Sequence, residues 1–244
     1  MKKFFWLCGG YPSMEACTAI VDAYMAGGCD GVEWAIPPAN PYREQAHLLP
    51  YFEIARRNCP DPAAHLAQMA AYRKKYPSAD VFPAVYQETV VELGVDRLCE
   101  LCLSCGIHTL FLIGTFAPEI ATALSKRMQT ATAVSYYMTE QELAKARQSS
   151  GFIYMQALPY QSELDAGYTK DRLRECICAM RGMGLTQPIY CAKGIRTPQD
   201  AAFVAASGAD GFILGSAMLQ YYGDLPALQE AVQSFQAGKA GEKA

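Results

Sequence analysis

A regular alternation of short apolar runs with longer helical patterns limits the folds open to this chain. The apolar or β-branched runs lie at about 3–8, 31–36, 80–86, 108–113, 131–135, 151–156, 187–191 and 210–214. Runs of this length predict buried strands, and each is followed by residues with helical spacing. Units of about 30 residues, repeated eight times, are the size of a (β/α)8 barrel. We therefore expect one TIM-barrel domain over residues 1–244, with a doubly wound open sheet as the alternative.

Glycines and capping residues mark the joints between the predicted elements. The segments 26–33, 104–111 and 206–213 each pass from a helical pattern through glycine into an apolar run. Glycine suits this joint because the backbone at a helix C-terminus often turns left-handed. Helix starts are indicated by Ser13, by Asp61 before Pro62 and by Thr197 before Pro198, since these residues favour the N-cap and the first turn.

Charge and hydropathy exclude several classes of partner. The formal net charge is -3 and the basic residues are not clustered, so there is no electrostatic footprint for nucleic acid or an anionic membrane surface. No apolar run approaches the roughly 20 residues of a membrane span. The apolar run after Lys2 and Lys3 is too short for a signal peptide. We expect a soluble, cytoplasmic protein that binds a small molecule.

The cysteines are interpreted as reduced core residues. A chain with a large core does not require disulfides, although this one has ten cysteines. The spacing of Cys99, Cys102 and Cys105 is compatible with metal ligation, but it also places the three on one helix face. No fourth ligand lies nearby in the sequence, and the histidines are scattered. Core packing is therefore favoured over a metal site.

The predicted second strand carries one carboxylate and the segment after it carries another. Glu33 lies in the apolar run at 31–36, where an acid is costly unless it is paired, hydrogen-bonded or employed. Glu44 follows in a long loop from Pro37 to about Pro60. A loop of this length after a barrel strand predicts a lid or binding loop, often with a helical turn of its own. The two acids are candidates for acid/base catalysis.

Glycine-containing segments follow the predicted seventh and eighth strands. The first is Ala192-Lys-Gly194-Ile-Arg-Thr197-Pro, and the second is Leu214-Gly215-Ser216-Ala217. In (β/α)8 barrels these two loops commonly form a phosphate site at a helix N-terminus. The alternative is that each segment is only a helix cap.

With these residues in place, the chain resembles the tryptophan synthase alpha chain family. The resemblance runs from Leu7-Cys-Gly-Gly-Tyr-Pro12 to Gly215-Ser-Ala217, and Val32-Glu-Trp-Ala-Ile-Pro37 is similar to the family's Leu-Glu-Leu-Gly-Ile-Pro motif. It implies a TIM barrel that cleaves indole-3-glycerol phosphate, by a retro-aldol step, to indole and glyceraldehyde 3-phosphate in tryptophan biosynthesis. It also implies that no metal or organic cofactor is required and that a tryptophan synthase beta subunit is the partner.

The resemblance also implies roles for individual residues. Glu33 matches the family's catalytic glutamate, which moves protons to and from the indole ring and the glycerol hydroxyl. Glu44 falls where the family has a catalytic aspartate, the partner of the indole nitrogen, and Tyr154 matches a tyrosine near the substrate. The positions that match the family's phosphate site are Gly194, Gly215 and Ser216.

Several residues depart from the family pattern. Glu44 is one methylene longer than aspartate, which is large on the scale of catalytic geometry. Gly114 stands where the family usually has an aspartate, and Glu163 falls on a phosphate-binding glycine, where a carboxylate is expected to repel a dianion. Lys193 and Arg196 flank the glycine of the seventh loop. They are expected to restore positive charge to the phosphate site; the alternative is that both face solvent.

Three readings follow from these matches and departures. The first is an indole-3-glycerol-phosphate lyase of the tryptophan synthase alpha type. The second is a diverged TIM-barrel enzyme that acts on another phosphorylated substrate, and the substitutions at Glu44 and Glu163 motivate it. The third is a weakly active chain that serves as a binding or activating partner subunit.

Overall fold

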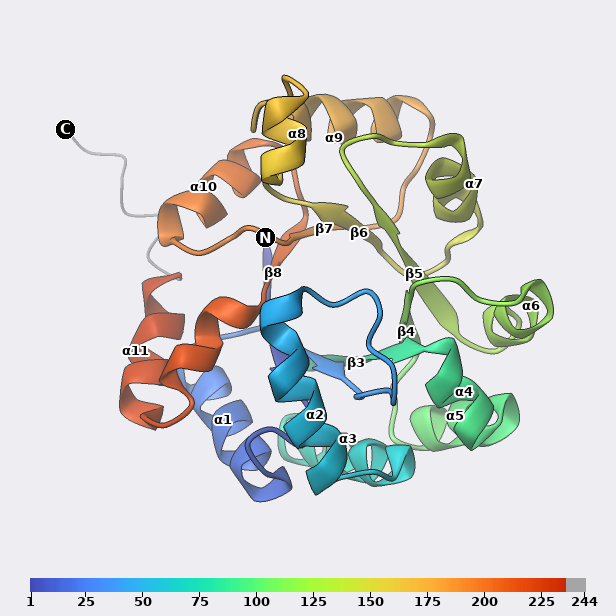
Figure 1. The fold of residues 1–244 in the computed structure, drawn as a ribbon, viewed down its shortest axis with the longest axis vertical. Helices are drawn as coiled ribbons and strands as arrows, with labels where there is room; N and C mark the ends of the chain where they lie inside the picture. Colours follow the sequence, from blue (N-terminus) through green and yellow to red (C-terminus); the bar gives the residue numbers. More distant parts are fainter. Residues whose placement is uncertain (236–244) are drawn as a thin grey trace.

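Eight parallel strands follow one another around a closed barrel, and β1 is hydrogen-bonded to both β2 and β8 (Figure 1). The strands are β1 (Lys2–Cys8), β2 (Gly31–Ala35), β3 (Asp80–Tyr86), β4 (Thr109–Ile113), β5 (Gln129–Val134), β6 (Ile153–Gln156), β7 (Ile189–Ala192) and β8 (Gly211–Leu214). The predicted TIM barrel is confirmed, and the open sheet is excluded because its two edges pair. This computed structural model describes residues 1–235, so the predicted domain end at 244 lies outside the described residues.

Helices surround the barrel on its outer side (Figure 1). They are α1 (Met14–Ala26), α2 (Leu49–Asn58), α3 (Pro62–Lys75), α4 (Gln87–Leu93), α5 (Val95–Ser104), α6 (Pro118–Ser125), α7 (Glu140–Gln148), α8 (Gln161–Asp165), α9 (Arg172–Gly182), α10 (Pro198–Ala206) and α11 (Leu225–Ser234), with short 3-10 helices η1 (Ala46–Leu48) and η2 (Ser216–Tyr221). Within residues 1–235 no helix is long and apolar enough to cross a membrane.

The predicted helix joints are confirmed. The side chains of Ser13, Asp61 and Thr197 accept hydrogen bonds from backbone amides in the first turns of α1, α3 and α10. Each of these bonds satisfies an amide that has no partner inside its helix. At the other helix ends, Gly106 and Gly208 have φ values of 72° and 92°, in the left-handed region that glycine adopts without strain.

Alternation along the strands divides the buried side chains into two cores. Side chains such as Phe4, Trp6 and Phe82 point into the barrel, whereas Phe5 and Trp34 pack between the strands and the helices. This is the two-residue period of a strand that is buried on both faces. Both tryptophans are therefore packing residues. The same period places Glu33, between two outward residues, on the inner face of β2.

The segment after β2 is more ordered than a loop. The sequence predicts a long loop from Pro37 to about Pro60, often with a helical turn of its own, and the structure contains η1 and the ten-residue helix α2 in its second half. Pro50 is compatible with this helix because it lies in the first turn. Phe52 of α2 is 1% exposed and its ring centroid lies 6.0 Å from that of Trp6. The helix thus contributes to the inner core at the end of the barrel, beside Glu44.

Candidate active site

Glu33 is a buried acid at the centre of β2. Its neighbours in register are Trp6 on β1 and Phe82 on β3, and its side chain is 3% exposed. Within the described residues its Oε2 atom has no hydrogen-bond partner. Burial, and secondarily the charge of Glu44, raise the pKa of the Glu33 carboxyl to about 8, while Lys193 acts in the opposite direction. A carboxyl group in this setting can hold a proton near neutral pH and release it.

Glu44 lies near Glu33 but in a different polar environment. The hydroxyl of Tyr86, at the end of β3, donates a hydrogen bond to Glu44 Oε1 at 3.0 Å. Burial raises the pKa of Glu44, whereas the Tyr86 hydrogen bond and the charge of Lys193 lower it. A donor that stabilises the charged form favours ionisation. The structure therefore brings the two predicted acids together and gives Glu44 the better-solvated carboxylate.

Tyr154 and Lys193 face this pair from the other side of the barrel. Tyr154, on β6, is 9% exposed, and its ring stacks on that of Phe111 at a centroid distance of 4.4 Å. The Nζ atom of Lys193 lies 6.0 Å from the centroid of the Tyr154 ring. Burial, together with the charges of Glu33 and Glu44, raises the pKa of Tyr154 well above its usual value. The phenol therefore remains protonated, as a hydrogen-bond donor rather than a base.

The predicted phosphate-binding residues lie in the loops after β7 and β8. Gly194 has a φ of 91°, and a Cβ atom there would lie 2.7 Å from Cβ of Leu158, so both conformation and space require glycine. Gly215 and Ser216 form the start of η2. The side chain of Arg196 is exposed and its backbone amide donates to Oδ2 of Asp200. Lys193 and Arg196 are both exposed, but only Lys193 has its ammonium near the ring of Tyr154.

The carboxylate of Glu163 holds the loop after β6 together through hydrogen bonds. Glu163 is 2% exposed, and its Oε2 accepts hydrogen bonds from the Gln156 side chain at 2.5 Å and from the Tyr160 amide at 2.8 Å. These bonds place the carboxylate at the N-terminus of α8, where its charge is also favoured by the helix dipole. An acid is therefore built into the loop where the resemblance implies a phosphate contact.

Three residues of this region were missed from the sequence: Gln156, Tyr86 and Tyr42. Gln156 had a usable signal, since it is a polar residue in a buried strand, two positions after Tyr154 and hence on the same face. Tyr86 ends a predicted strand and had no distinguishing feature. The hydroxyl of Tyr42 accepts a hydrogen bond from the Thr115 amide at 3.1 Å, a contact between residues far apart in the chain that spacing does not indicate.

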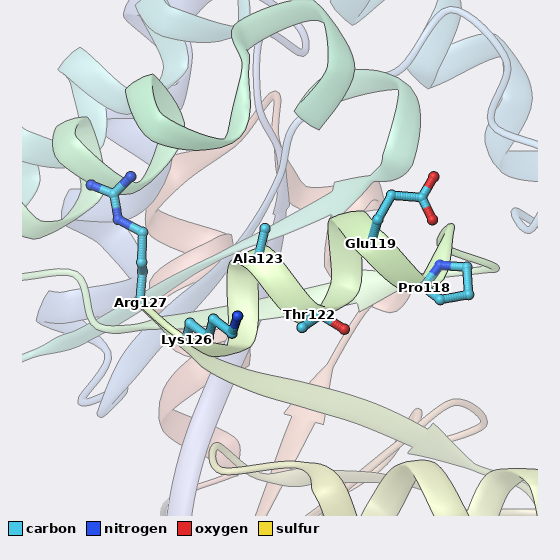
Figure 2. A pocket seen from close by; sticks show the side chains of 6 residues that line it. All are labelled: Pro118, Glu119, Thr122, Ala123, Lys126 and Arg127. Carbon is cyan, nitrogen blue, oxygen red and sulfur yellow. The ribbon is translucent and has the colours of Figure 1, made fainter.

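The structure has a pocket that includes Glu44 and a separate groove away from the acid pair. One, of about 530 Å³, is lined by residues 38–57, including Glu44, Phe52 and Arg56, and so adjoins the acid pair. The other, of about 700 Å³, is an open groove along α6; its lining side chains are Pro118, Glu119, Thr122, Ala123, Lys126 and Arg127 (Figure 2). It contains none of the predicted site residues.

The three cysteines with ligand-like spacing lie on α5 and at its C-terminal end. Cys99 and Cys102 of α5 are fully buried in the outer core, and Cys105 is partly buried. Residues 1–235 contain no group of three or more His, Cys, Asp or Glu side chains that could hold a metal ion. The burial of Cys99 and Cys102 agrees with the prediction of core packing, and Cys105 packs against the same core.

The fold and the acid pair define a single-domain (β/α)8 barrel with ionisable side chains gathered near the carboxyl ends of its strands, where barrel enzymes carry their active sites. A family model for the tryptophan synthase alpha chain matches residues 4–242. The chain belongs to this family.

Individual relatives agree with this assignment. The tryptophan synthase alpha chain of Aeromonas salmonicida (strain A449) is 28% identical over 222 residues, covering 86% of this chain and 80% of that protein. That of Novosphingobium aromaticivorans is 24% identical over 220 residues, covering 88% and 81%. Among solved structures, ligand-free tryptophan synthase from M. tuberculosis has a TM-score of 0.82 at 23% identity, covering 97% of this chain and 92% of that one. The structural likeness shows the fold, and the low identity leaves the chemistry to the site residues.

Proposed function

We propose that this chain is a lyase that cleaves indole-3-glycerol phosphate to indole and glyceraldehyde 3-phosphate by a retro-aldol step. The observation that carries the proposal is Glu33, a buried acid with a pKa of about 8 and with one oxygen that has no hydrogen-bond partner within residues 1–235. Cleavage needs a proton at the ring carbon that becomes C3 of indole and removal of the proton of the hydroxyl beside the breaking bond. One carboxyl that can both give and take a proton suits these two transfers.

Glu44 supplies the second charge that the reaction requires. Protonation at the ring carbon leaves positive charge on the indole nitrogen, and a fixed carboxylate stabilises that charge as it develops. Glu44 is longer than the family's aspartate, and its hydrogen bond from Tyr86 limits the freedom that the extra methylene would otherwise allow. Tyr154, stacked on Phe111, offers an aromatic surface beside Glu33 for the indole ring.

The phosphate group is proposed to bind at the loops after β7 and β8. Gly194, Gly215 and Ser216 bring backbone to this edge without large side chains, and backbone amides at a helix start bind phosphate well. Arg196, exposed on the same edge, adds a guanidinium that can bind phosphate in a bidentate manner. This proposed phosphate site does not use the loop after β6, where the carboxylate of Glu163 would repel a phosphate.

The direct test is indole release from indole-3-glycerol phosphate. Glu33→Gln preserves the shape of the side chain and removes its proton chemistry, so turnover should fall by on the order of 100-fold to 10,000-fold. Glu119→Gln, on the exposed groove of α6 (Figure 2), is the matched control and should keep wild-type turnover. An inactive wild type, or an active Glu33→Gln, would exclude the proposed reaction mechanism.

A tryptophan synthase beta subunit is the proposed partner. Tyr42, Tyr137, Tyr160 and Leu164 are 53%, 51%, 37% and 46% exposed, and all four lie in segments that follow strands. Exposed aromatic and aliphatic side chains are typical of interaction surfaces. Indole release should therefore be measured with and without a beta subunit, because closure of these loops by a partner would raise turnover.

A second candidate is cleavage or isomerisation of another phosphorylated substrate, and Glu163 favours it. A buried carboxylate with two donors cannot move aside for a dianion without leaving those donors unpaired. Wild-type protein that binds inorganic phosphate but releases no indole, with or without a beta subunit, would support this second candidate. A third outcome is that the protein neither binds phosphate nor releases indole but still activates a beta subunit. That outcome would support the hypothesis of a partner subunit.

A further inference from the structure

Lys193 is held in a conformation that an ordinary lysine avoids. Its φ is 68°, and within residues 1–235 it is one of two residues other than glycine with positive φ. The left-handed region costs roughly 1–2 kcal/mol for such a residue. The neighbouring backbone fixes this geometry, because the Lys193 carbonyl accepts a hydrogen bond from the Leu158 amide at 3.2 Å. The surroundings of the Lys193 side chain indicate what this strained backbone conformation achieves.

The side chain of Lys193 is exposed, and its ammonium lies over the ring of Tyr154, on the side of the barrel opposite the acids. Its Nζ atom lies 6.0 Å from the Tyr154 ring centroid, and its charge acts on both Glu33 and Glu44. Among the described residues it forms no ion pair. The ammonium therefore acts on the acid pair through its charge and without an ion-pair contact.

Charged groups of α2 lie near Glu44 as well: Glu53, Arg56 and Arg57 line the same pocket as Glu44, and Arg56 is paired with Glu92. The remaining groups are neutral or weakly acidic. Cys8 approaches Glu44 from β1, Tyr86 from β3, and Tyr154 from β6, while Tyr160 lies beside Tyr154 from the loop after β6. Burial raises the pKa of Cys8, Tyr86 and Tyr154, so none of the three ionises before the carboxyls do. Lys193 is the cation whose charge acts on both acids.

We propose that Lys193 is a positioning residue for catalysis: its ammonium is the counter-charge of the Glu33 and Glu44 pair, and it allows Glu44 to ionise while Glu33 keeps its proton. The asymmetry follows from the hydrogen bonds. Tyr86 donates to Glu44 at 3.0 Å, whereas Glu33 Oε2 has no donor within the described residues. One cation with two acids therefore stabilises a single negative charge, and that charge settles on Glu44.

This inference deepens the proposed function, on which its mechanistic meaning rests. Cleavage needs a neutral acid at one carboxyl and a carboxylate at the other in the same enzyme form. Two acids without a cation would both tend to stay protonated in a buried site, and Glu44 would then stabilise the indole nitrogen poorly. Lys193 makes the productive protonation state the prevalent one at neutral pH.

The test is the titration of the two carboxyls in the substrate-free protein, followed by carbon-13 NMR of the glutamate side chains. Assignment uses Glu33→Gln and Glu44→Gln. Lys193→Met should raise the titration midpoints of both carboxyls by about half to one pH unit, the size expected for the loss of one nearby positive charge. Lys193→Arg should keep midpoints close to those of the wild type. Lys126→Met, an exposed lysine of α6 (Figure 2), is the control for loss of one positive charge and should change neither midpoint.

A second variant separates the charge from the backbone. Lys193→Gly removes the ammonium and also relieves the positive φ, so it should unfold at higher urea than the wild type and still show the upward shift. Unchanged midpoints in folded Lys193→Met or Lys193→Gly would overturn the inference. The titration needs no substrate, so it decides the role of Lys193 even if indole is not released. With activity present, the acidic limb of the pH profile of kcat/KM should move upward in Lys193→Met and return in Lys193→Arg.

Discussion

The side-chain amide of Gln156 donates a hydrogen bond to the carboxylate of Glu163 at 2.5 Å, across the turn that joins β6 to α8. Gln156 also donates to the Leu158 carbonyl at 2.9 Å, so both of its amide hydrogens are used within this turn. Hydrogen bonds to a charged acceptor are stronger than those between neutral groups. The turn is therefore fixed by its own acid, without a bound anion.

Replacement of Glu163 by glutamine should improve anion binding. Glutamine keeps an oxygen that can accept from the Tyr160 amide, and it removes a negative charge from the edge where the phosphate is proposed to bind. We expect inorganic phosphate to bind about fivefold more tightly to Glu163→Gln, because one nearby charge contributes about 1 kcal/mol. Isothermal titration calorimetry measures this directly. Asp165→Asn, which removes an exposed charge from the same helix, should change phosphate affinity much less; equal effects would contradict a local role for Glu163.

Glu33 should make the protein less stable as pH rises. Its pKa is about 8 in the folded chain and about 4.3 when unfolded, so between these values the folded state holds a proton that the unfolded state has lost. Stability should therefore be fully retained below about pH 4 and decline between pH 4 and 8, by up to about 1 kcal/mol per pH unit. Urea unfolding at pH 5 and pH 8 measures the decline.

The matched variant for this decline is Glu33→Gln, which cannot ionise. Its stability relative to the wild type should rise between pH 5 and pH 8, since only the wild type must accommodate a buried charge or retain its proton. Glu119→Gln serves as the exposed control. Parallel pH curves for the wild type and Glu33→Gln would show that Glu33 does not titrate in this window.

The barrel could be predicted from the sequence because its signals are local. Buried strands, N-caps such as Ser13 and glycine joints such as Gly208 depend on residues close together in the chain. Glu33 could be singled out for the same reason, since one acid in an apolar run is visible without a structure. The full length of helix α2 was not predicted: the sequence suggested a loop with at most a helical turn, although Pro50 lies in a first turn where proline is tolerated.

The rest of the site depends on contacts between distant segments. Tyr86 meets Glu44 only because β3 lies beside the segment after β2, and the two residues are 42 positions apart. Likewise, spacing places Lys193 in the seventh loop, whereas its direction is set by a left-handed backbone and by the loop after β6. A sequence pattern identifies which edge a residue lies on, but the direction of its side chain follows from tertiary packing.

Gly114 and Tyr42 form another such contact and should respond to substitution together. Gly114 has a φ of 87°, and a Cβ atom there would lie 2.1 Å from the Tyr42 hydroxyl. Gly114→Ala should therefore displace Tyr42 and expose the Thr115 amide, which now donates to that hydroxyl. We expect faster hydrogen exchange at Thr115 and a loss of roughly 1–2 kcal/mol of stability from the strained backbone.

Tyr42→Phe separates the two parts of that effect. It removes the acceptor for the Thr115 amide while leaving the glycine conformation unstrained, so exchange at Thr115 should accelerate with only a small loss of stability. Slow exchange at Thr115 in both variants would show that the hydroxyl does not protect this amide. Any side chain at 114 would compete with Tyr42 for the same space.

His65 should make the protein sensitive to mild acid. The ring is 1% exposed on α3, and its Nε2 atom lies 3.2 Å from the Cys59 carbonyl. Burial lowers its pKa to about 4, against about 6.5 in an unfolded chain. Between pH 4 and 6.5 the unfolded state therefore binds a proton at His65 and the folded state does not. The free energy of unfolding should fall as pH drops from about 6.5 to 4, by roughly 1 kcal/mol per pH unit.

Replacement of His65 by glutamine tests this origin of acid sensitivity. The glutamine amide can still donate to the Cys59 carbonyl but cannot bind a proton in this range. Urea unfolding between pH 4 and pH 7 should show a flatter pH dependence in His65→Gln than in the wild type, even if the variant is less stable at pH 7. His47→Gln, at an exposed histidine of η1, is the control and should keep the wild-type slope. Equal slopes in the wild type and His65→Gln would mean that other groups cause the loss, with the carboxyls that accept protons below pH 5 the next to examine.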